Sequence, residues 1–328
     1  MSRRIAVALA VAASLGVAAC SSSAATSAGT TPSPSSSAAP AVPTVAPATA
    51  VAPASVAPSA TAPYYVSLGD SYAAGYQAGL GTTRDGFAYQ VADQAQATTT
   101  PLQLVNFACA GATTTSILQN AGCPPAALGP DAAPYDGQTQ IEAAEAFLKS
   151  HPGEVGLITV SIGGNDIAPC GGGGPDSASC VTQAVAGVST NLTTLLARLR
   201  AAAGPAVPIV GTTYPDVLLG VWVSGTPEGQ QLANLSITAF RSLLNPALQK
   251  AYEGAGGQLV DVTEATGAYG PMTDTTDVAP YGAIPVPVAQ VCELTTFCSK
   301  QDIHPTPEGY RIIADLVFQA FLASRPSQ

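Results

Sequence analysis

The alternation of short apolar runs with longer amphipathic stretches is the feature that most limits what this chain can fold into. Five apolar runs of strand length are bounded by turn residues, and a segment of helical periodicity follows each of them. We expect strands at Tyr64–Leu68, Leu102–Phe107, Val155–Ile162, Val207–Thr213 and Gln258–Val262.

The intervening stretches are rich in Ala, Leu, Gln and Glu and place apolar residues at helical spacing. The last of them follows Thr306, a suitable N-cap with proline directly after it. We expect an α/β fold: one three-layer domain with a five-stranded parallel sheet and a site beyond the carboxyl ends of the strands. The expected helices are Phe87–Ala97, Thr139–Ser150, Val181–Ala203, Glu228–Glu253 and Pro307–Ala323.

The first 63 residues are expected to lie outside this domain. Residues 1–20 combine two arginines, an apolar run too short to span a bilayer and small residues before Cys20, which predicts a lipoprotein-type export signal with Cys20 as the lipid anchor. An ordinary cleaved signal is the alternative. Residues 21–63 are mostly Ala, Ser, Thr, Pro and Val without charge, which predicts a disordered tether, and the domain is expected over 64–328.

The charge and the cysteine spacing exclude several classes of function. The chain has 11 Lys and Arg against 21 Asp and Glu, a net charge of −10, and no basic cluster beyond Arg3 and Arg4, so we expect no nucleic-acid partner. Two histidines and seven cysteines without a C-x-x-C pair give no metal-ligand pattern. We therefore expect neither a metal nor a cofactor, and contact with a membrane only through the lipid anchor.

Small and polar residues follow the first three expected strands. Gly69-Asp70-Ser71 places a hydroxyl at a strand-to-helix turn, where a nucleophile is exposed beside backbone N–H groups. Gly111 follows the second strand, and Gly163-Gly164-Asn165-Asp166 follows the third and offers a side-chain amide. Each block alone is compatible with an ordinary turn, but all three fall at the same edge of the expected sheet.

One of the two histidines is the candidate general base. His304 lies in Gln301-Asp302-Ile303-His304-Pro305, just before the last expected helix, and imidazole is the usual group that activates a hydroxyl near neutral pH. His151 comes at the end of an expected surface helix, where it is predicted to interact with the helix dipole.

Together these blocks resemble those of the SGNH (GDSL-type) serine hydrolase family, in the family's order and over Tyr64 to Phe321. The resemblance implies a flavodoxin-like order of the five strands. It also implies that Ser71 is the nucleophile, that His304 is the base, and that the oxyanion hole comprises the N–H groups of Ser71 and Gly111 with the amide of Asn165.

The histidine block departs from the family in one respect. The family commonly has an aspartate three residues before the histidine, whereas Gln301 stands there and Asp302 stands two residues before. We expect Asp302 to complete a triad with Ser71 and His304. The alternative is a dyad in which a backbone carbonyl orients the imidazole.

Six cysteines remain in the expected domain, an even number in an exported chain, which favours disulfides. Their short separations favour the pairs Cys109–Cys123, Cys170–Cys180 and Cys292–Cys298, each beside one of the blocks. We expect these bridges to rigidify the rim of the site; general stabilisation of a secreted domain is the alternative. Residues 171–174 either form part of this rim or belong to a flexible exposed loop. Trp222 with its two valine neighbours either lines an acyl pocket or belongs to the core.

The sequence thus predicts an exported esterase or lipase that acts on carboxylic esters and carries its lipid anchor at the cell surface. Two alternatives remain open. One is a carbohydrate O-deacetylase of the same fold, and the other is a cell-surface binding lipoprotein that has kept the fold without the activity. The low aromatic content, 6%, gives little material for sugar platforms and favours acyl esters.

Overall fold

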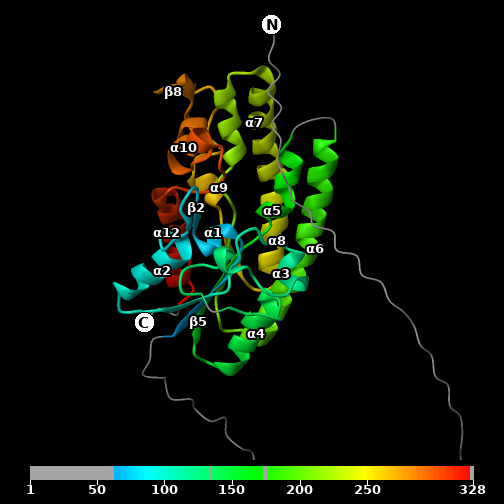
Figure 1. Cartoon of the computed structure of the whole chain (residues 1–328), viewed down its shortest axis with the longest axis vertical. Coiled ribbons are helices and arrows are strands. Elements are labelled where there is room, and N and C mark those ends of the chain that lie inside the picture. Colours follow the sequence, from blue (N-terminus) through cyan, green and yellow to red (C-terminus); the bar gives the residue numbers. More distant parts are fainter. Residues whose placement is uncertain (1–62, 133, 173–175, 326–328) are drawn as a thin grey trace, which may run out of the picture. The chain divides into compact units, whose positions relative to one another are not determined.

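A computed structural model of the chain describes residues 63–132, 134–172 and 176–325 (Figure 1). The predicted leader with Cys20, and nearly all of the predicted tether, lie outside the described residues. Five parallel strands form the central sheet in the order β4-β1-β5-β6-β7. They are β1 (Tyr64–Gly69), β4 (Gln103–Asn106), β5 (Val155–Ser161), β6 (Ile209–Thr212) and β7 (Gln258–Val260).

This order confirms the predicted α/β fold. Counted along the chain, the strands lie in the sequence 2-1-3-4-5, which is the flavodoxin-like arrangement. The first strand is paired on both edges, with Val66 beside Val105 of β4 on one side and Ile158 of β5 on the other. All five carboxyl ends therefore meet at one edge of the sheet, with the end of β1 between those of its two neighbours.

Alternating residues of the strands bury two separate layers. Val66 and Leu68 of β1 face the layer formed with α4, α6 and α8, while Tyr65 faces the layer formed with α1, α2 and α12. Figure 1 shows the two groups of helices on opposite sides of the sheet. These helices are α1 (Ser71–Ala74), α2 (Phe87–Gln96), α4 (Gln140–Ser150), α6 (Ser177–Ala203), α8 (Asn245–Gly254) and α12 (Pro307–Ala323).

Local signals set the beginnings of two of these helices. Thr139 and Glu142 form a reciprocal capping box at the start of α4, and the Thr306 hydroxyl accepts a hydrogen bond from the N–H of Gly309 at the start of α12. At the end of α4, His151 Nδ1 lies 2.9 Å from the carbonyl oxygen of Phe147. This contact with the last helical turn confirms the expected placement of His151, close to the amino end of β5 and therefore away from the carboxyl edge of the sheet.

One predicted helix, Glu228–Glu253, is divided in the structure. It consists of α7 (Pro227–Ala239), a π-helical turn η4 (Phe240–Leu244) and α8. Pro246 has no N–H and cannot donate to the carbonyl of Ser242, so a regular α-helix cannot continue through this point. Helix α6 also begins four residues before the predicted Val181.

A third hydrophobic cluster lies outside the two sheet layers and was not predicted as a unit. It joins α7 with η3 (Val217–Ser224), the hairpin of β8 (Thr275–Val278) and β9 (Gly282–Pro285), and α10 (Val286–Leu294). Leu219 and Val288 are wholly buried in it. Trp222 packs against this cluster and is partly buried, so its contacts are those of a core residue.

None of the helices in the described part of the chain is both long and apolar enough to span a membrane. Three disulfides join the cysteines in the pairs that the sequence separations favour: Cys109–Cys123, Cys170–Cys180 and Cys292–Cys298. The short elements are β2 (Tyr76–Gln77), β3 (Gly81–Thr82), α3 (Ser116–Gln119), η1 (Pro125–Ala127), α5 (Gly164–Ile167), η2 (Ala168–Gly172), α9 (Val262–Ala265) and α11 (Phe297–Lys300).

Candidate active site

The turn that follows β1 places Ser71 at the first position of α1. Gly69 has a φ of +139°, and a Cβ atom there would lie 2.1 Å from the carbonyl oxygen of Ser161, so only glycine fits. Asp70 then caps the short helix, because its Oδ1 accepts a hydrogen bond of 3.0 Å from the N–H of Tyr72. The side chain of Ser71 emerges from this turn and the residue is 6% exposed.

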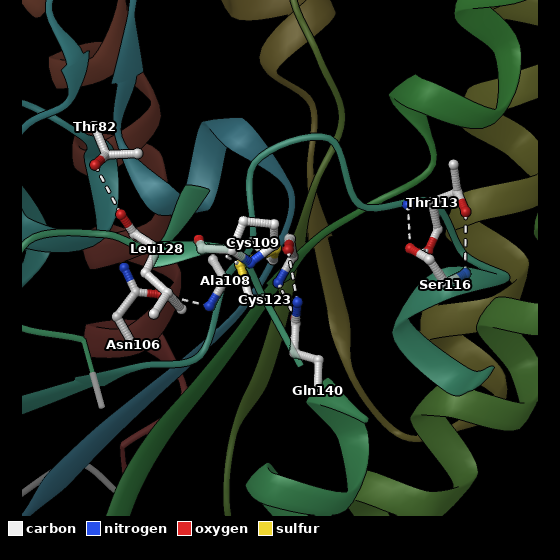
Figure 2. The surroundings of a disulfide bond; sticks show 11 residues. Thr82, Asn106, Ala108, Cys109, Thr113, Ser116, Cys123, Leu128 and Gln140 are labelled. Carbon is white, nitrogen blue, oxygen red and sulfur yellow. Dashed lines mark hydrogen bonds between the residues drawn. A yellow bond between two sulfur atoms is a disulfide. The ribbon is translucent and has the colours of Figure 1, made fainter. Parts of the chain in front are cut away.

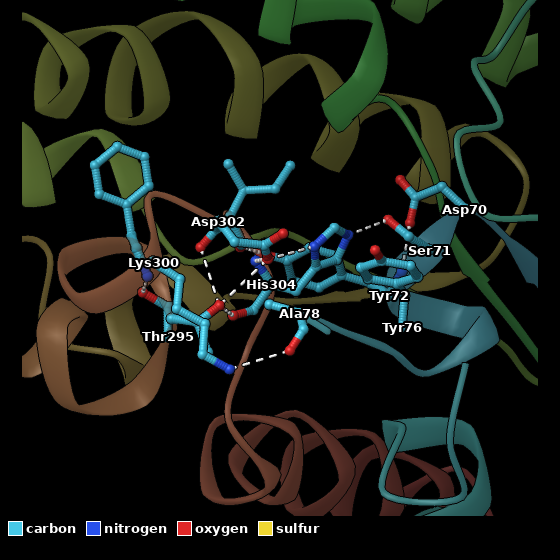
Figure 3. Close-up of polar contacts among 12 residues, drawn as sticks. Asp70, Ser71, Tyr72, Tyr76, Ala78, Thr295, Lys300, Asp302 and His304 are labelled. Atoms are coloured by element: carbon cyan, nitrogen blue, oxygen red, sulfur yellow. Dashed lines mark hydrogen bonds and ion pairs between the residues drawn. The ribbon is translucent and has the colours of Figure 1, made fainter. Parts of the chain in front are cut away.

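Three predicted residues lie in one hydrogen-bonded line (Figure 3). Ser71 Oγ is 2.8 Å from Nε2 of His304, and Nδ1 of the same imidazole is 2.7 Å from Oδ1 of Asp302. Both ring nitrogens are therefore engaged, one by a hydroxyl and one by a carboxylate. This is the arrangement in which imidazole can take a proton from the hydroxyl while the carboxylate holds its orientation and tautomer.

The spacing of two residues between Asp302 and His304 is explained by a tight local turn. Oδ1 of Asp302 also accepts a hydrogen bond of 2.9 Å from the backbone N–H of His304, which is the Asx-turn geometry of an aspartate two residues before a donor. Gln301 is exposed, has a φ of +55° and ends α11, so it reverses the chain before the turn. Asp302, and not Gln301, therefore reaches the imidazole.

Contacts with neighbouring segments hold the histidine turn in place. The N–H of Thr296 donates to the carbonyl of His304 over 2.9 Å, and the hydroxyl of Tyr72 donates to the carbonyl of Ile303 over 2.6 Å. The ring of Tyr76 lies against the imidazole, with 4.5 Å between the ring centroids. Tyr72 belongs to α1, which also carries Ser71, and Tyr76 belongs to β2. Both elements therefore support the turn at Asp302–His304, called the histidine turn below.

The electrostatics of the site keep the imidazole neutral and the carboxylate ionised. Burial lowers the pKa of His304 and outweighs the opposing effect of the hydrogen bond to Asp302. Burial acts on Asp302 in the direction of a higher pKa, but the hydrogen bonds from the backbone and ring of His304 outweigh it, so the pKa of this carboxyl is lowered. A neutral imidazole is the form that accepts a proton from a hydroxyl.

The predicted glycine and asparagine blocks are tied to each other. Asn165 Nδ2 donates to the carbonyl of Ala112 over 2.9 Å, directly after Gly111, which is exposed and has a φ of +86°. Asp166 accepts hydrogen bonds from the N–H and the hydroxyl of Thr114. One proton of the Asn165 amide remains, and the described residues provide no hydrogen-bond acceptor for the N–H of Ser71 or of Gly111.

The sequence does not predict the buried side chain that binds the turn at Gly69–Ser71, which we call the nucleophile turn after the predicted role of Ser71. Gln140 at the start of α4 accepts a hydrogen bond of 2.7 Å from the N–H of Gly69 and donates one of 3.1 Å to its carbonyl. That carbonyl also accepts from the N–H of Cys109, beside the Cys109–Cys123 disulfide (Figure 2). A buried glutamine at a helix start gives no pattern that distinguishes it in sequence, so only the fold identifies this clamp.

A cavity of about 300 Å³ adjoins the glycine block. Its lining includes Gly111 and Ala112 together with the Cys109–Cys123 bridge region, Ile117 and Gln140. Of the predicted site residues, Gly111 of the glycine block and Cys109 line this cavity. Among the described residues, no group of three or more His, Cys, Asp or Glu side chains is arranged to hold a metal ion.

The sequence of the chain matches a known protein family. Residues 67–312 match the GDSL-like Lipase/Acylhydrolase family, a span of about three quarters of the chain. The protein therefore belongs to this family of hydrolases, and the resemblance deduced from the four blocks is confirmed at the level of the family. A search of curated proteins finds no match to the chain.

Several solved structures are similar to this chain at low sequence identity. They are an extracellular lipase from Streptomyces rimosus (18% identity, TM-score 0.46, 81% of this chain and 100% of that one), a catalytic mutant of an acetylxylan esterase from Geobacillus stearothermophilus (12%, 0.46, 81% and 97%), and a lipase/acylhydrolase from Enterococcus faecalis (16%, 0.44, 81% and 99%).

Proposed function

We propose that the protein is a serine hydrolase that cleaves carboxylic esters, with Ser71 as nucleophile, His304 as general base and Asp302 as the third member of the triad. The observation that carries this proposal is the continuous line of hydrogen bonds from Ser71 Oγ through the imidazole to Asp302. Membership of the GDSL-like lipase and acylhydrolase family supports the same class of reaction.

The reaction proceeds in two halves. Ser71 Oγ attacks the acyl carbonyl carbon while its proton passes to Nε2 of His304, and the carbonyl electron pair moves onto the oxygen. Collapse of this tetrahedral intermediate expels the alcohol, which takes the proton from the imidazolium and leaves an acyl-enzyme. Water then attacks the acyl group in the same way, and the acid and the free serine are released.

The oxyanion is stabilised by three donors: the N–H groups of Ser71 and Gly111 and the remaining amide proton of Asn165. The support for this assignment is that neither backbone N–H has an acceptor among the described residues and that the hydrogen bond to Ala112 fixes the Asn165 amide. Donors that are fixed before the charge develops need no reorganisation during the reaction.

The substrate is proposed to be a carboxylic ester, because the hydrogen-bonded line from Ser71 to Asp302 and the family of lipases and acylhydrolases both support transfer of an acyl group. A carbohydrate acetyl ester remains the alternative substrate of the same site.

The cellular location is proposed from the sequence and the disulfides together. Three disulfides in a domain of this size are typical of exported proteins, and the residues around Cys20 have the pattern of a lipid-modified N-terminus. We infer an exported domain, 64–328, joined by the tether 21–63 to a lipid anchor on Cys20. Radiolabelled palmitate incorporated by the wild-type protein and lost in Cys20→Ala would support the anchor.

The first experiment is hydrolysis of p-nitrophenyl acetate, butyrate, octanoate and palmitate by the wild-type protein, with Ser71→Ala beside it. We expect ester hydrolysis that falls by about a thousandfold or more in Ser71→Ala, and the ester hydrolysed fastest identifies the preferred acyl chain length. Ser150→Ala, which removes an exposed hydroxyl at the end of α4, is the matched control and should retain full activity. A folded wild-type protein that neither hydrolyses these esters nor reacts with an organophosphonate would contradict the proposal.

A further inference from the structure

A buried side chain to which the mechanism gives no role lies just beyond β6, the fourth strand of the central sheet along the chain. Tyr214 lies two residues beyond the end of β6 and is 5% exposed. Its hydroxyl donates a hydrogen bond of 2.6 Å to Oδ2 of Asp70. Asp70 is the residue immediately before the proposed nucleophile and is itself 1% exposed.

The Asp70 carboxylate therefore connects two separate strands at the nucleophile turn. Oδ1 accepts from the N–H of Tyr72 inside α1, while Oδ2 accepts from Tyr214 beyond β6. The backbone N–H of Asp70 also donates to the carbonyl of Ser161 at the end of β5. Figure 3 shows the Asp70 side chain beside Ser71, on the other side of the serine from the imidazole. The carboxyl that caps the first turn of α1, next to Ser71, is thus also hydrogen-bonded to Tyr214.

The aromatic ring of Tyr214 touches the other parts of the site. A Cβ atom on Gly164 would lie 3.1 Å from the ring, so the backbone directly before Asn165 rests on it. The ring of Tyr72 meets it edge to face, with 5.0 Å between centroids, and the Tyr72 hydroxyl donates to the carbonyl of Ile303 in the histidine turn. One side chain therefore contacts the nucleophile turn, the asparagine block and the residue that supports His304.

We propose that Tyr214 is a positioning residue that sets the nucleophile turn against the oxyanion asparagine through its hydroxyl on Asp70 and its ring beneath Gly164. This inference rests on the proposed serine hydrolase function. Tyr214 is assigned no contact with substrate, so its removal is expected to reduce the rate of the chemical step and to leave substrate binding nearly unchanged.

The pKa of Asp70 gives a second measure of the coupling between the Tyr214 hydroxyl and the Asp70 carboxyl. Burial raises the pKa of Asp70 to about 7, and the hydrogen bond from Tyr214 acts in the opposite direction. Loss of the hydroxyl should therefore raise this pKa further. Of the other titratable groups around the carboxyl, Asp166 also raises its pKa, and the surrounding tyrosines have raised pKa values and are neutral at pH 7: Tyr72, Tyr252 and Tyr310.

The test compares Tyr214→Phe with Tyr65→Phe. Both variants keep a buried ring and remove one hydroxyl, but the Tyr65 hydroxyl lies 2.8 Å from Oγ1 of Thr159 within the sheet. We expect Tyr214→Phe to lower kcat by about tenfold to a hundredfold with KM changed by less than about twofold. Tyr65→Phe should retain kcat within about twofold. Equal kcat values for the two variants, or a loss confined to KM, would overturn the proposal.

A double-variant cycle and a titration complete the test. Because the hydroxyl and the carboxylate act as one unit, Asp70→Asn combined with Tyr214→Phe should lose no more rate than the worse single variant; multiplied losses would contradict the coupling. The infrared band of the protonated Asp70 carboxyl, identified by its absence in Asp70→Asn, should titrate at higher pH in Tyr214→Phe. An unchanged titration would overturn the coupling even in a protein without esterase activity, which separates this failure from failure of the proposed function.

Discussion

The nucleophile turn and the histidine turn form one site but are built in different ways. The turn at Gly69–Ser71 lies within the edge of the sheet, and groups distant in sequence hold it: the Gln140 amide, the Tyr214 hydroxyl and the carbonyl of Ser161. The turn at Asp302–His304 lies in a connection between two helices. Its hydrogen bonds are made partly by near neighbours in the sequence: Asp302 Oδ1 accepts from the N–H of His304, and the N–H of Thr296 donates to the carbonyl of His304.

The difference shows how a fold can hold a proposed nucleophile and its proposed base with unequal rigidity. A residue held by buried contacts from several strands moves only if the sheet itself is disturbed, whereas a surface turn can shift without unfolding the domain. The histidine turn is joined to the nucleophile helix by a small number of contacts, chiefly the Tyr72 hydroxyl and the Tyr76 ring. Substitutions at the histidine turn should therefore lower mainly kcat, whereas substitutions at the nucleophile turn should lower both kcat and the free energy of unfolding.

The largest effect is expected at the histidine turn. Asp302→Asn should lower kcat by about 10³–10⁴-fold, because the carboxylate that orients the imidazole and stabilises the imidazolium is lost. The free energy of unfolding should change little, since the site is partly exposed. Steady-state kinetics with p-nitrophenyl butyrate and a thermal melt provide the two readouts. Gln301→Ala is the matched control and should stay within about twofold of wild type; equal small losses in both variants would favour a dyad oriented by a backbone carbonyl.

At the nucleophile turn, loss of the Gln140 amide should lower both the free energy of unfolding and kcat. Gln140→Leu leaves the buried N–H of Gly69 without an acceptor, which is expected to lower the free energy of unfolding by about 1–3 kcal/mol. Displacement of Ser71 should reduce kcat by about tenfold to a hundredfold. Urea unfolding and ester hydrolysis measure both quantities. Gln94→Leu, at a glutamine on α2 that binds Asp315, should leave kcat unchanged; a full rate in Gln140→Leu would show that the clamp does not position the nucleophile.

The disulfides sharpen the same comparison. Removal of Cys292–Cys298 by alanine at both positions should lower the free energy of unfolding by about 2 kcal/mol and reduce kcat several-fold, because this loop contains Thr296, whose N–H donates to the carbonyl of His304. Removal of Cys170–Cys180 should cost a similar stability, about 3 kcal/mol, with kcat within about twofold of wild type. If both pairs affected kcat equally, the bridges would serve general stability rather than the site.

The smallest expected effect is a shift of the pH profile. The proposed base acts in its neutral form, and burial lowers the pKa of His304 from its ordinary value near 6.5. The acid limb of kcat/KM should therefore have its midpoint below pH 6.5. Asp302 raises the imidazole pKa, so the residual activity of Asp302→Asn should have its acid limb at still lower pH. A midpoint above 6.5 that persists in Asp70→Asn, where the carboxyl with a raised pKa beside Ser71 is absent, would contradict the burial of a neutral base.

Much of this architecture could be predicted from local patterns. Strand β5 is expected at Val155–Ile162 and observed at Val155–Ser161, and α12 has its predicted limits, because apolar periodicity and a capping threonine act over a few residues. The elements that were missed are those whose form depends on contacts made elsewhere. The π-helical turn lies inside the helical spacing of Glu228–Glu253, which does not reveal it, and the cluster around α10 joins segments that are far apart in the sequence.

The class of fold and the residue types that the proposed chemistry uses could be predicted from the sequence, and short separations favoured the pairs of cysteines, because strand ends, short loop closures and the four blocks are all local features. The folded chain was needed to show that Asp302 reaches the imidazole from two residues away, since this depends on the reversed backbone at Gln301. The same holds for Gln140 and Tyr214. Their partners lie 71 and 144 residues away, and a buried amide or hydroxyl acquires its role only when folding removes water and leaves one acceptor or donor within reach.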